Sequence, residues 1–143
     1  MMRRSIVAAI VATLLLGGCA TRTEPTQAEL TAQWEERNVA PVNYKADLLA
    51  YMRTYLNDPT RIRGAAVSPP QRKTVIGNPG ERYVACVRYD ARKSGGDYAG
   101  VKVGAAVYSS GKLDRFLDTP RETGEICKDA AYQPFPELQQ LTR

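Results

Sequence analysis

Two pairs of carboxylates are the side chains in this sequence closest to a catalytic arrangement. Asp90 with Asp97, or Asp114 with Asp118, would be the candidates for acid–base work. Each pair stands beside turn signals, where aspartate is favoured because its side chain bonds the local backbone. The chain has no histidine, which removes the commonest general base and the commonest metal ligand. We therefore predict a protein that is not an enzyme, with no catalytic residue, metal or cofactor.

The cysteines offer a different chemistry. There are three, and Cys19 stands apart from Cys86 and Cys127. It follows two glycines at the end of a short apolar run over residues 5–16, which two arginines precede. A membrane-spanning helix needs about 20 apolar residues, so this run is too short to cross a bilayer and is typical of a cleaved signal peptide.

Residues 16–19, Leu-Gly-Gly-Cys, resemble the lipobox of bacterial lipoproteins. The resemblance implies that residues 1–18 are a signal peptide and that Cys19 carries lipid, including an acyl chain such as palmitate on its amino group. Ala20 stands where an aspartate would resemble an inner-membrane retention signal. This favours an outer-membrane anchor with the protein facing the periplasm. The alternative is an ordinary secretory signal followed by a coincidental cysteine.

Cys86 and Cys127 would then lie in an oxidising compartment, where disulfides persist. We expect the two to pair, and the alternative is two separate buried thiols. A bridge that closes a loop of about 40 residues would stabilise the fold by roughly 4 kcal/mol. That is a large contribution for a domain of this size.

Removal of residues 1–18 leaves 125 residues, enough for one small domain. Residues 19–42 are predicted to form a lipid-anchored tether. A short helix over residues 27–37 is expected within it, because Thr26 and Glu29 have the spacing of a capping box. Trp34 is expected to pack against the domain, and an exposed anchor is the alternative. The domain itself covers residues 43–143.

The clearest helix is predicted over residues 44–56, with Asn43 as its N-cap. Its apolar residues recur at spacings of three and four, which favours a face packed on a sheet over a ligand groove. The expected strands cover residues 61–68 (an edge strand), 71–77, 81–91, 98–108 and 113–117.

The last three of these strands should form an antiparallel meander, followed by a loop over residues 119–124. The predicted fold class is therefore α+β. One main amphipathic helix packs on a small antiparallel β-sheet, with one disulfide.

Residues 86–100 resemble a pattern found in small envelope lipoproteins of Gram-negative bacteria that have no assigned function. The pattern runs from a cysteine through a basic pair, Arg92 and Lys93, to Gly-x-Tyr-x-Gly at residues 96–100. The resemblance covers roughly residues 44–118 and brings no activity with it. This chain departs from the pattern at residues 89–90, where Tyr-Asp replaces an asparagine.

Basic residues gather in the middle of the chain. Residues 53–121 contain thirteen Lys and Arg against six Asp and Glu, an arrangement suited to an anionic partner. The alternative is a solvated strand face whose arginines keep sheet edges from pairing. The candidate anion- or partner-binding residues are Arg88, Arg92, Lys93 and Lys102.

These features predict a lipid-anchored, non-catalytic accessory protein of the outer membrane. Its expected partners are the membrane, through the lipid, and an envelope protein, lipopolysaccharide or peptidoglycan. Nucleic acid is not expected at an envelope location. The alternatives are an inhibitor or ligand-binding lipoprotein, for example against a host lysozyme or protease, and a lipoprotein subunit of a secretion or conjugation machine.

Overall fold

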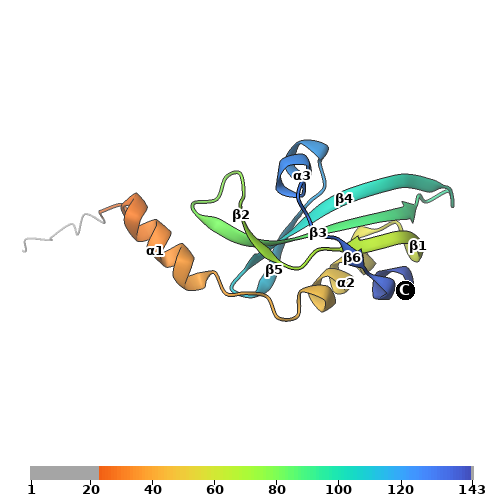
Figure 1. Ribbon diagram of the computed structural model, residues 1–143, viewed down its shortest axis with the longest axis horizontal. Helices are drawn as coiled ribbons and strands as arrows, with labels where there is room; N and C mark the ends of the chain where they lie inside the picture. Colours follow the sequence, from red (N-terminus) through yellow and green to blue (C-terminus); the bar gives the residue numbers. More distant parts are fainter. Residues whose placement is uncertain (1–22, 143) are drawn as a thin grey trace, which may run out of the picture.

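The computed structural model describes residues 23–142 as a six-stranded sheet with helices on both faces (Figure 1). The strand order is β5-β4-β3-β1-β6, and β2 pairs with β3 outside this path. All of the pairings are antiparallel, which confirms the predicted α+β class. The elements are α1 (Gln27–Arg37), α2 (Tyr44–Tyr55), β1 (Asp58–Val67), β2 (Gln71–Thr74), β3 (Glu81–Arg92), β4 (Tyr98–Ser109), β5 (Lys112–Leu117), α3 (Pro120–Ile126), β6 (Gln133–Pro134) and α4 (Pro136–Gln139).

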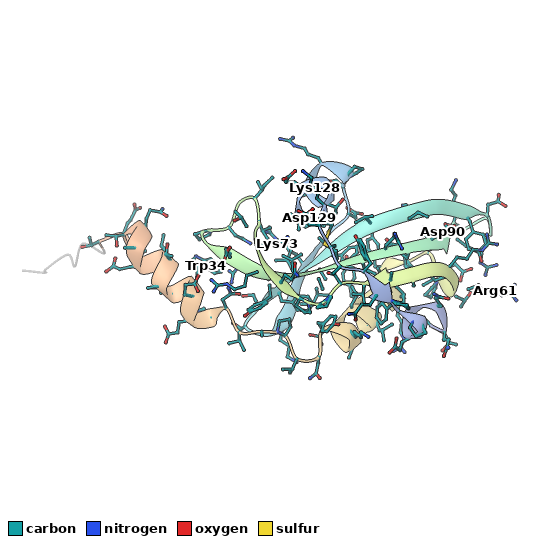
Figure 2. The ribbon with its side chains drawn as sticks, in the orientation of Figure 1. Trp34, Arg61, Lys73, Asp90, Lys128 and Asp129 are labelled. Atoms are coloured by element: carbon teal, nitrogen blue, oxygen red, sulfur yellow. A yellow bond between two sulfur atoms is a disulfide. The ribbon has the colours of Figure 1, made fainter. Side chains whose placement is uncertain are left out.

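Helix α1 extends away from the sheet (Figure 1) and has no buried residue. The predicted capping box starts it: Thr26 N–H donates to the Glu29 carboxylate at 2.7 Å, and Glu29 N–H donates back to the Thr26 hydroxyl. Trp34, labelled in Figure 2, packs against the domain as predicted, with the buried Arg82 guanidinium 3.6 Å from its ring centroid. A Glu35–Arg72 ion pair at 2.6 Å adds a second contact.

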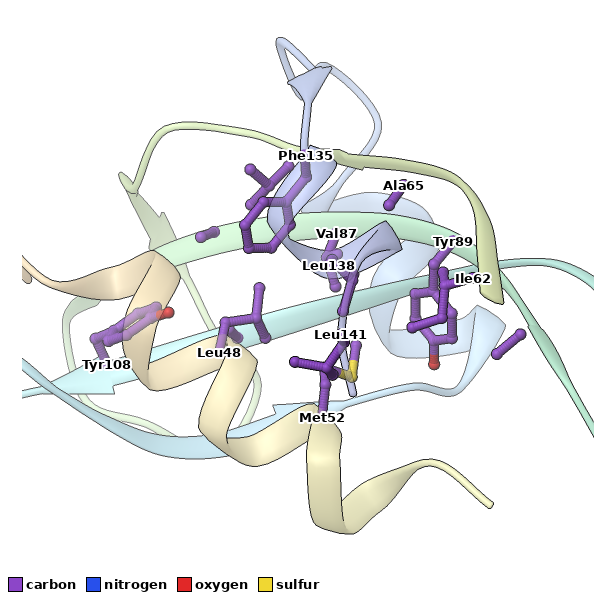
Figure 3. Packing of buried hydrophobic residues seen from close by; sticks show 14 residues of the cluster. Leu48, Met52, Ile62, Ala65, Val87, Tyr89, Tyr108, Phe135, Leu138 and Leu141 are labelled. Carbon is purple, nitrogen blue, oxygen red and sulfur yellow. The ribbon is translucent and has the colours of Figure 1, made fainter. Parts of the chain in front are cut away.

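Helix α2 packs its apolar face on the sheet, as the three-and-four spacing predicts. Leu48 and Met52 are completely buried there. Asn43 occupies the N-cap position, but its side chain makes no capping hydrogen bond. Figure 3 shows the resulting core, in which α2 and the C-terminal segment meet one face of the sheet. Its largest members are Leu48, Met52, Val87, Tyr89, Tyr108, Phe135 and Leu138.

The second face of the sheet is also apolar, and this corrects the prediction of one main helix. Val84, Ala105 and Val107 form a second core on this face, which α3 covers through Ile126. The predicted loop over residues 119–124 is also wrong, because α3 begins at Pro120. Several short helices, rather than a single main one, therefore bury the two faces.

The predicted meander of β3, β4 and β5 is confirmed. The β4–β5 turn has positive φ at Ser110 (50°) and Gly111 (73°), as a tight two-residue hairpin requires. The edge position predicted for β1 is corrected, because β1 pairs with β3 on one side and with β6 on the other. The partner strand β6 has only two residues, too few for a sequence pattern to reveal it.

Candidate functional site

A hollow of about 630 Å³ lies on the side of the sheet that α3 covers. We call it the α3 groove. Its floor comes from strands β3 and β4, and α3 with the turn after it forms the opposite wall. Lys128, labelled in Figure 2, follows the end of α3. The groove is lined by Arg88, Val101, Lys102, Val103, Asp118, Pro120, Thr123, Gly124, Cys127, Lys128 and Tyr132.

Two local features hold α3 in the position that forms this groove. The Thr119 hydroxyl accepts the Glu122 N–H, and Pro120 occupies the first turn, so the helix starts at a defined point. At the other end, Cys127 forms the predicted disulfide with Cys86 of β3, with the two Cα atoms 5.7 Å apart. The covalent bond therefore fixes the wall of the groove to its floor.

Positive charge predominates around the α3 groove. Arg88, Lys102 and Lys128 are all exposed, and none of the three forms an ion pair with a carboxylate in the described part of the chain. Asp118 is the one acidic residue of the lining, and its carboxylate accepts a hydrogen bond from the Tyr55 hydroxyl at 2.5 Å. The groove thus has three cations without counter-ions and one carboxylate that is already engaged.

An aromatic ring stands beside the arginine. The Arg88 guanidinium lies 5.1 Å from the ring centroid of Tyr132, within the range of a cation–π contact. Burial raises the pKa of the Tyr132 hydroxyl, although the charge of Arg88 opposes the rise. The hydroxyl is therefore a neutral hydrogen-bond donor at physiological pH, and it adds no negative charge to the groove.

The four basic residues predicted as a binding site do not form one cluster. Arg88 and Lys102 line the α3 groove. Lys102 also lines a second hollow of about 200 Å³ on the α2 face, together with Arg92 and Lys93. We call this second space the α2 hollow. Arg92 is the least available of the four, because it forms an ion pair with Asp58 and donates to the Thr60 hydroxyl at 3.2 Å.

The Asp58 side of that ion pair is also fixed. The Thr60 hydroxyl and N–H both donate to the Asp58 carboxylate. These bonds, with a smaller contribution from Arg92, lower the pKa of Asp58. Arg92 and Asp58 therefore join the start of β1 to the end of β3, which is a structural role.

Sequence reasoning missed Lys128 and Tyr132, although one signal pointed to Lys128. Side chains of a strand alternate between faces, so Arg88 shares a face with Cys86. The partner of Cys86 is Cys127, and Lys128 is its neighbour in the chain. The predicted disulfide therefore implied that Lys128 lies near Arg88.

One carboxylate of each pair considered for acid–base chemistry makes a structural hydrogen bond. Asp90 accepts the Gly100 N–H at 2.9 Å, and Asp118 accepts the Tyr55 hydroxyl. Between residues 23 and 142, no group of three or more Cys, Asp or Glu side chains is arranged to hold a metal ion. The chemistry that this arrangement supports best is the binding of an anionic group.

Cys19 and the rest of the predicted signal peptide lie outside the described residues. Within the described residues, no helix combines the length and the apolar character needed to cross a membrane. Comparison of the chain with protein-family models, curated proteins and solved structures gave no match. The resemblance to envelope lipoproteins therefore stays a prediction.

Proposed function

We propose that this protein is a lipid-anchored component of the bacterial outer membrane that faces the periplasm. Its domain acts without catalysis, by holding an anionic group of another envelope component in the α3 groove. Residues 1–19 of the sequence support the anchor, and the domain supports the binding role. The two parts are independent, so a separate experiment tests each.

The single observation that carries the binding role is the set of three cations without counter-ions around an apolar hollow. Arg72, for comparison, is ion-paired with both Glu35 and Glu81. At the α3 groove, Arg88, Lys102 and Lys128 have no such neighbour. An anion placed there gains attraction from several charges at once, and a guanidinium can hold a carboxylate or phosphate by two parallel hydrogen bonds.

The apolar residues of the groove suit a partner larger than a free ion. Val101 and Val103 lie on the floor, and Pro120 lies at the rim. Val101 is 70% exposed, so part of this apolar surface faces water. Contact with an apolar part of the partner would remove this surface from water.

Photo-cross-linking in intact cells tests the proposal. A photo-activatable amino acid replaces Val101 in the groove, or Ile76 as a control of matched exposure (75%) outside both hollows. We expect a dominant adduct from position 101 and little from position 76. The adduct should disappear when Arg88→Glu and Lys128→Glu are combined. Equal labelling from both positions would contradict a binding role for the groove.

Lipid attachment is measured in the same cells, which are grown with an alkyne-labelled fatty acid. The wild-type chain should carry the label, and Cys19→Ala should lose it. Label that persists in the Cys19→Ala variant would refute the lipobox interpretation and leave the groove untouched.

A further inference from the structure

The outer edge of β4 is only partly covered by its neighbour. Strand β5 pairs with β4 from Ser109 to Ala105, where Leu117 is the last paired residue. β4 itself continues back to Tyr98 and remains paired with β3 on its inner side. On the outer side, no strand in residues 23–142 pairs with residues 101–104. Four residues of a strand span roughly 13 Å, enough for a short extended segment to lie alongside.

This uncovered edge runs between the two hollows. Val101 and Val103 face the α3 groove, on the same side of the sheet as Ala105 and Val107. Lys102 pairs with Tyr89, whose side chain belongs to the α2 face, and Lys102 lines both hollows. Side chains of an added strand would alternate in the same way, one set entering the α3 groove and the other entering the α2 hollow.

Positive charge predominates around both hollows. The α3 groove has Arg88, Lys102 and Lys128 against Asp118, and the α2 hollow has Lys93, Lys102 and the paired Arg92 with no acidic residue in its lining. If the edge only had to avoid pairing with other chains, the charge of Lys102 alone would be enough to prevent it. A hollow on each side with exposed cations fits acidic side chains on both faces of an incoming strand.

We propose that residues 101–104 are a β-augmentation site for an extended, acidic peptide segment of another protein. The segment would add to the sheet in line with β5, antiparallel to β4. Its backbone would take the unpaired N–H and C=O groups of the edge, and its side chains would give specificity through the two hollows. The inference rests on the proposed binding role and adds the class of partner and the mode of contact.

The probe is a C-amidated hexapeptide with fluorescein on its N-terminus and the sequence Glu-Glu-Val-Val-Glu-Glu, which places glutamates on both faces of a strand. It is titrated against the full chain in detergent micelles. A twin with lysine in place of glutamate controls for charge. Two N-methylated forms, one at the odd positions of the peptide and one at the even positions, remove backbone donors from opposite edges of the strand. Binding is followed by fluorescence anisotropy, and deuterium uptake is measured over residues 98–105.

We expect the acidic peptide to bind, the lysine twin not to bind, and uptake over residues 98–105 to fall. One N-methylated form should bind at least about tenfold more weakly, since several hydrogen bonds of the edge are lost together. The other form should bind like the parent peptide. Combining Arg88→Ala with Lys128→Ala should weaken binding by about tenfold, and Lys112→Ala, a matched exposed cation at the β4–β5 turn, should not.

Three results would overturn the inference. Equal binding of both N-methylated forms would place the acidic peptide in the groove without strand pairing. Equal binding of acidic and basic peptides would remove the charge argument. No binding of the acidic peptide, together with a cellular adduct to lipopolysaccharide or peptidoglycan at position 101, would reject a peptide partner while the proposed binding role stands.

Discussion

At the residue scale, Gly104 shows how closely the packing on β4 depends on one missing side chain. A Cβ built at this position would lie 2.1 Å from a ring carbon of Phe116. That ring in turn contacts Tyr51 and Tyr55, with centroid separations of 5.1 and 5.2 Å. Gly104 therefore lets an aromatic cluster lie directly on β4, at the end of the uncovered edge.

Gly104→Ala should lower the free energy of unfolding by about 1–3 kcal/mol, because the Phe116 ring must move out of its packed position. The matched control is Gly95→Ala, where nothing lies within 4 Å of the added atom, and it should change stability by less than about 0.5 kcal/mol. Urea unfolding of both variants measures the difference. Equal stability of the two variants would mean that the ring contact is not a constraint.

The basic residues show what sequence reasoning can and cannot identify at this scale. Charge counting found Arg88 and Lys102, because an excess of cations is visible in any linear window. It could not separate Arg92, whose charge is taken up by Asp58 from a distant part of the chain. It also missed Lys128, since only the disulfide brings this residue to β3. Counter-ions are long-range contacts, and composition does not contain them.

At the scale of elements, helix α3 was not predicted, although the sequence contains a signal for its start. Thr119 and Glu122 have capping-box spacing, and their side chains hydrogen-bond at 2.6 Å. The helix has only seven residues and contains Gly124, so its intrinsic propensity is poor. Burial of Ile126 against the second face of the sheet stabilises the helix, and that face was not predicted.

The Cys86–Cys127 disulfide should contribute both to stability and to the shape of the groove. The bridged residues are 41 apart in sequence, so the double variant Cys86→Ala with Cys127→Ala should lose about 4 kcal/mol of unfolding free energy. Deuterium uptake over residues 120–132 should rise, because the wall is no longer fixed to β3. Gly95→Ala again serves as the control of unchanged stability. Unaltered uptake in the double variant would show that packing alone holds the wall.

The longer elements were predicted well because their signals are local. The capping box fixed the start of α1, the apolar spacing identified α2, and turn residues bounded β3, β4 and β5. The position of β1 within the sheet was not accessible in the same way. It depends on β6, two residues from the far end of the chain that pair with Ala66 and Val67.

At the scale of the whole molecule, the groove, helix α1 and the proposed anchor form a consistent arrangement. Helix α1 spans roughly 16 Å at 1.5 Å per residue, and it carries the chain away from the sheet (Figure 1). It is joined to the domain by side-chain contacts such as Trp34 with Arg82, and by a backbone hydrogen bond in which the Ser110 N–H donates to the Arg37 carbonyl at 3.0 Å. A lipid on Cys19 would therefore hold the domain near the membrane while leaving the α3 groove open to a partner.

The central claim is that an anionic partner occupies the α3 groove. Measuring the reactivity of lysines of the wild-type chain in the intact envelope tests this claim. Cells and purified protein are treated with the same amine-acylating reagent, and the rate at each lysine is compared by mass spectrometry. Lys112 is the internal reference, since it lies roughly 23 Å from Lys102 along β4. We predict that Lys102 and Lys128 react several-fold more slowly in the envelope than in the purified protein, with Lys112 unchanged. Equal ratios at all three lysines would contradict the account.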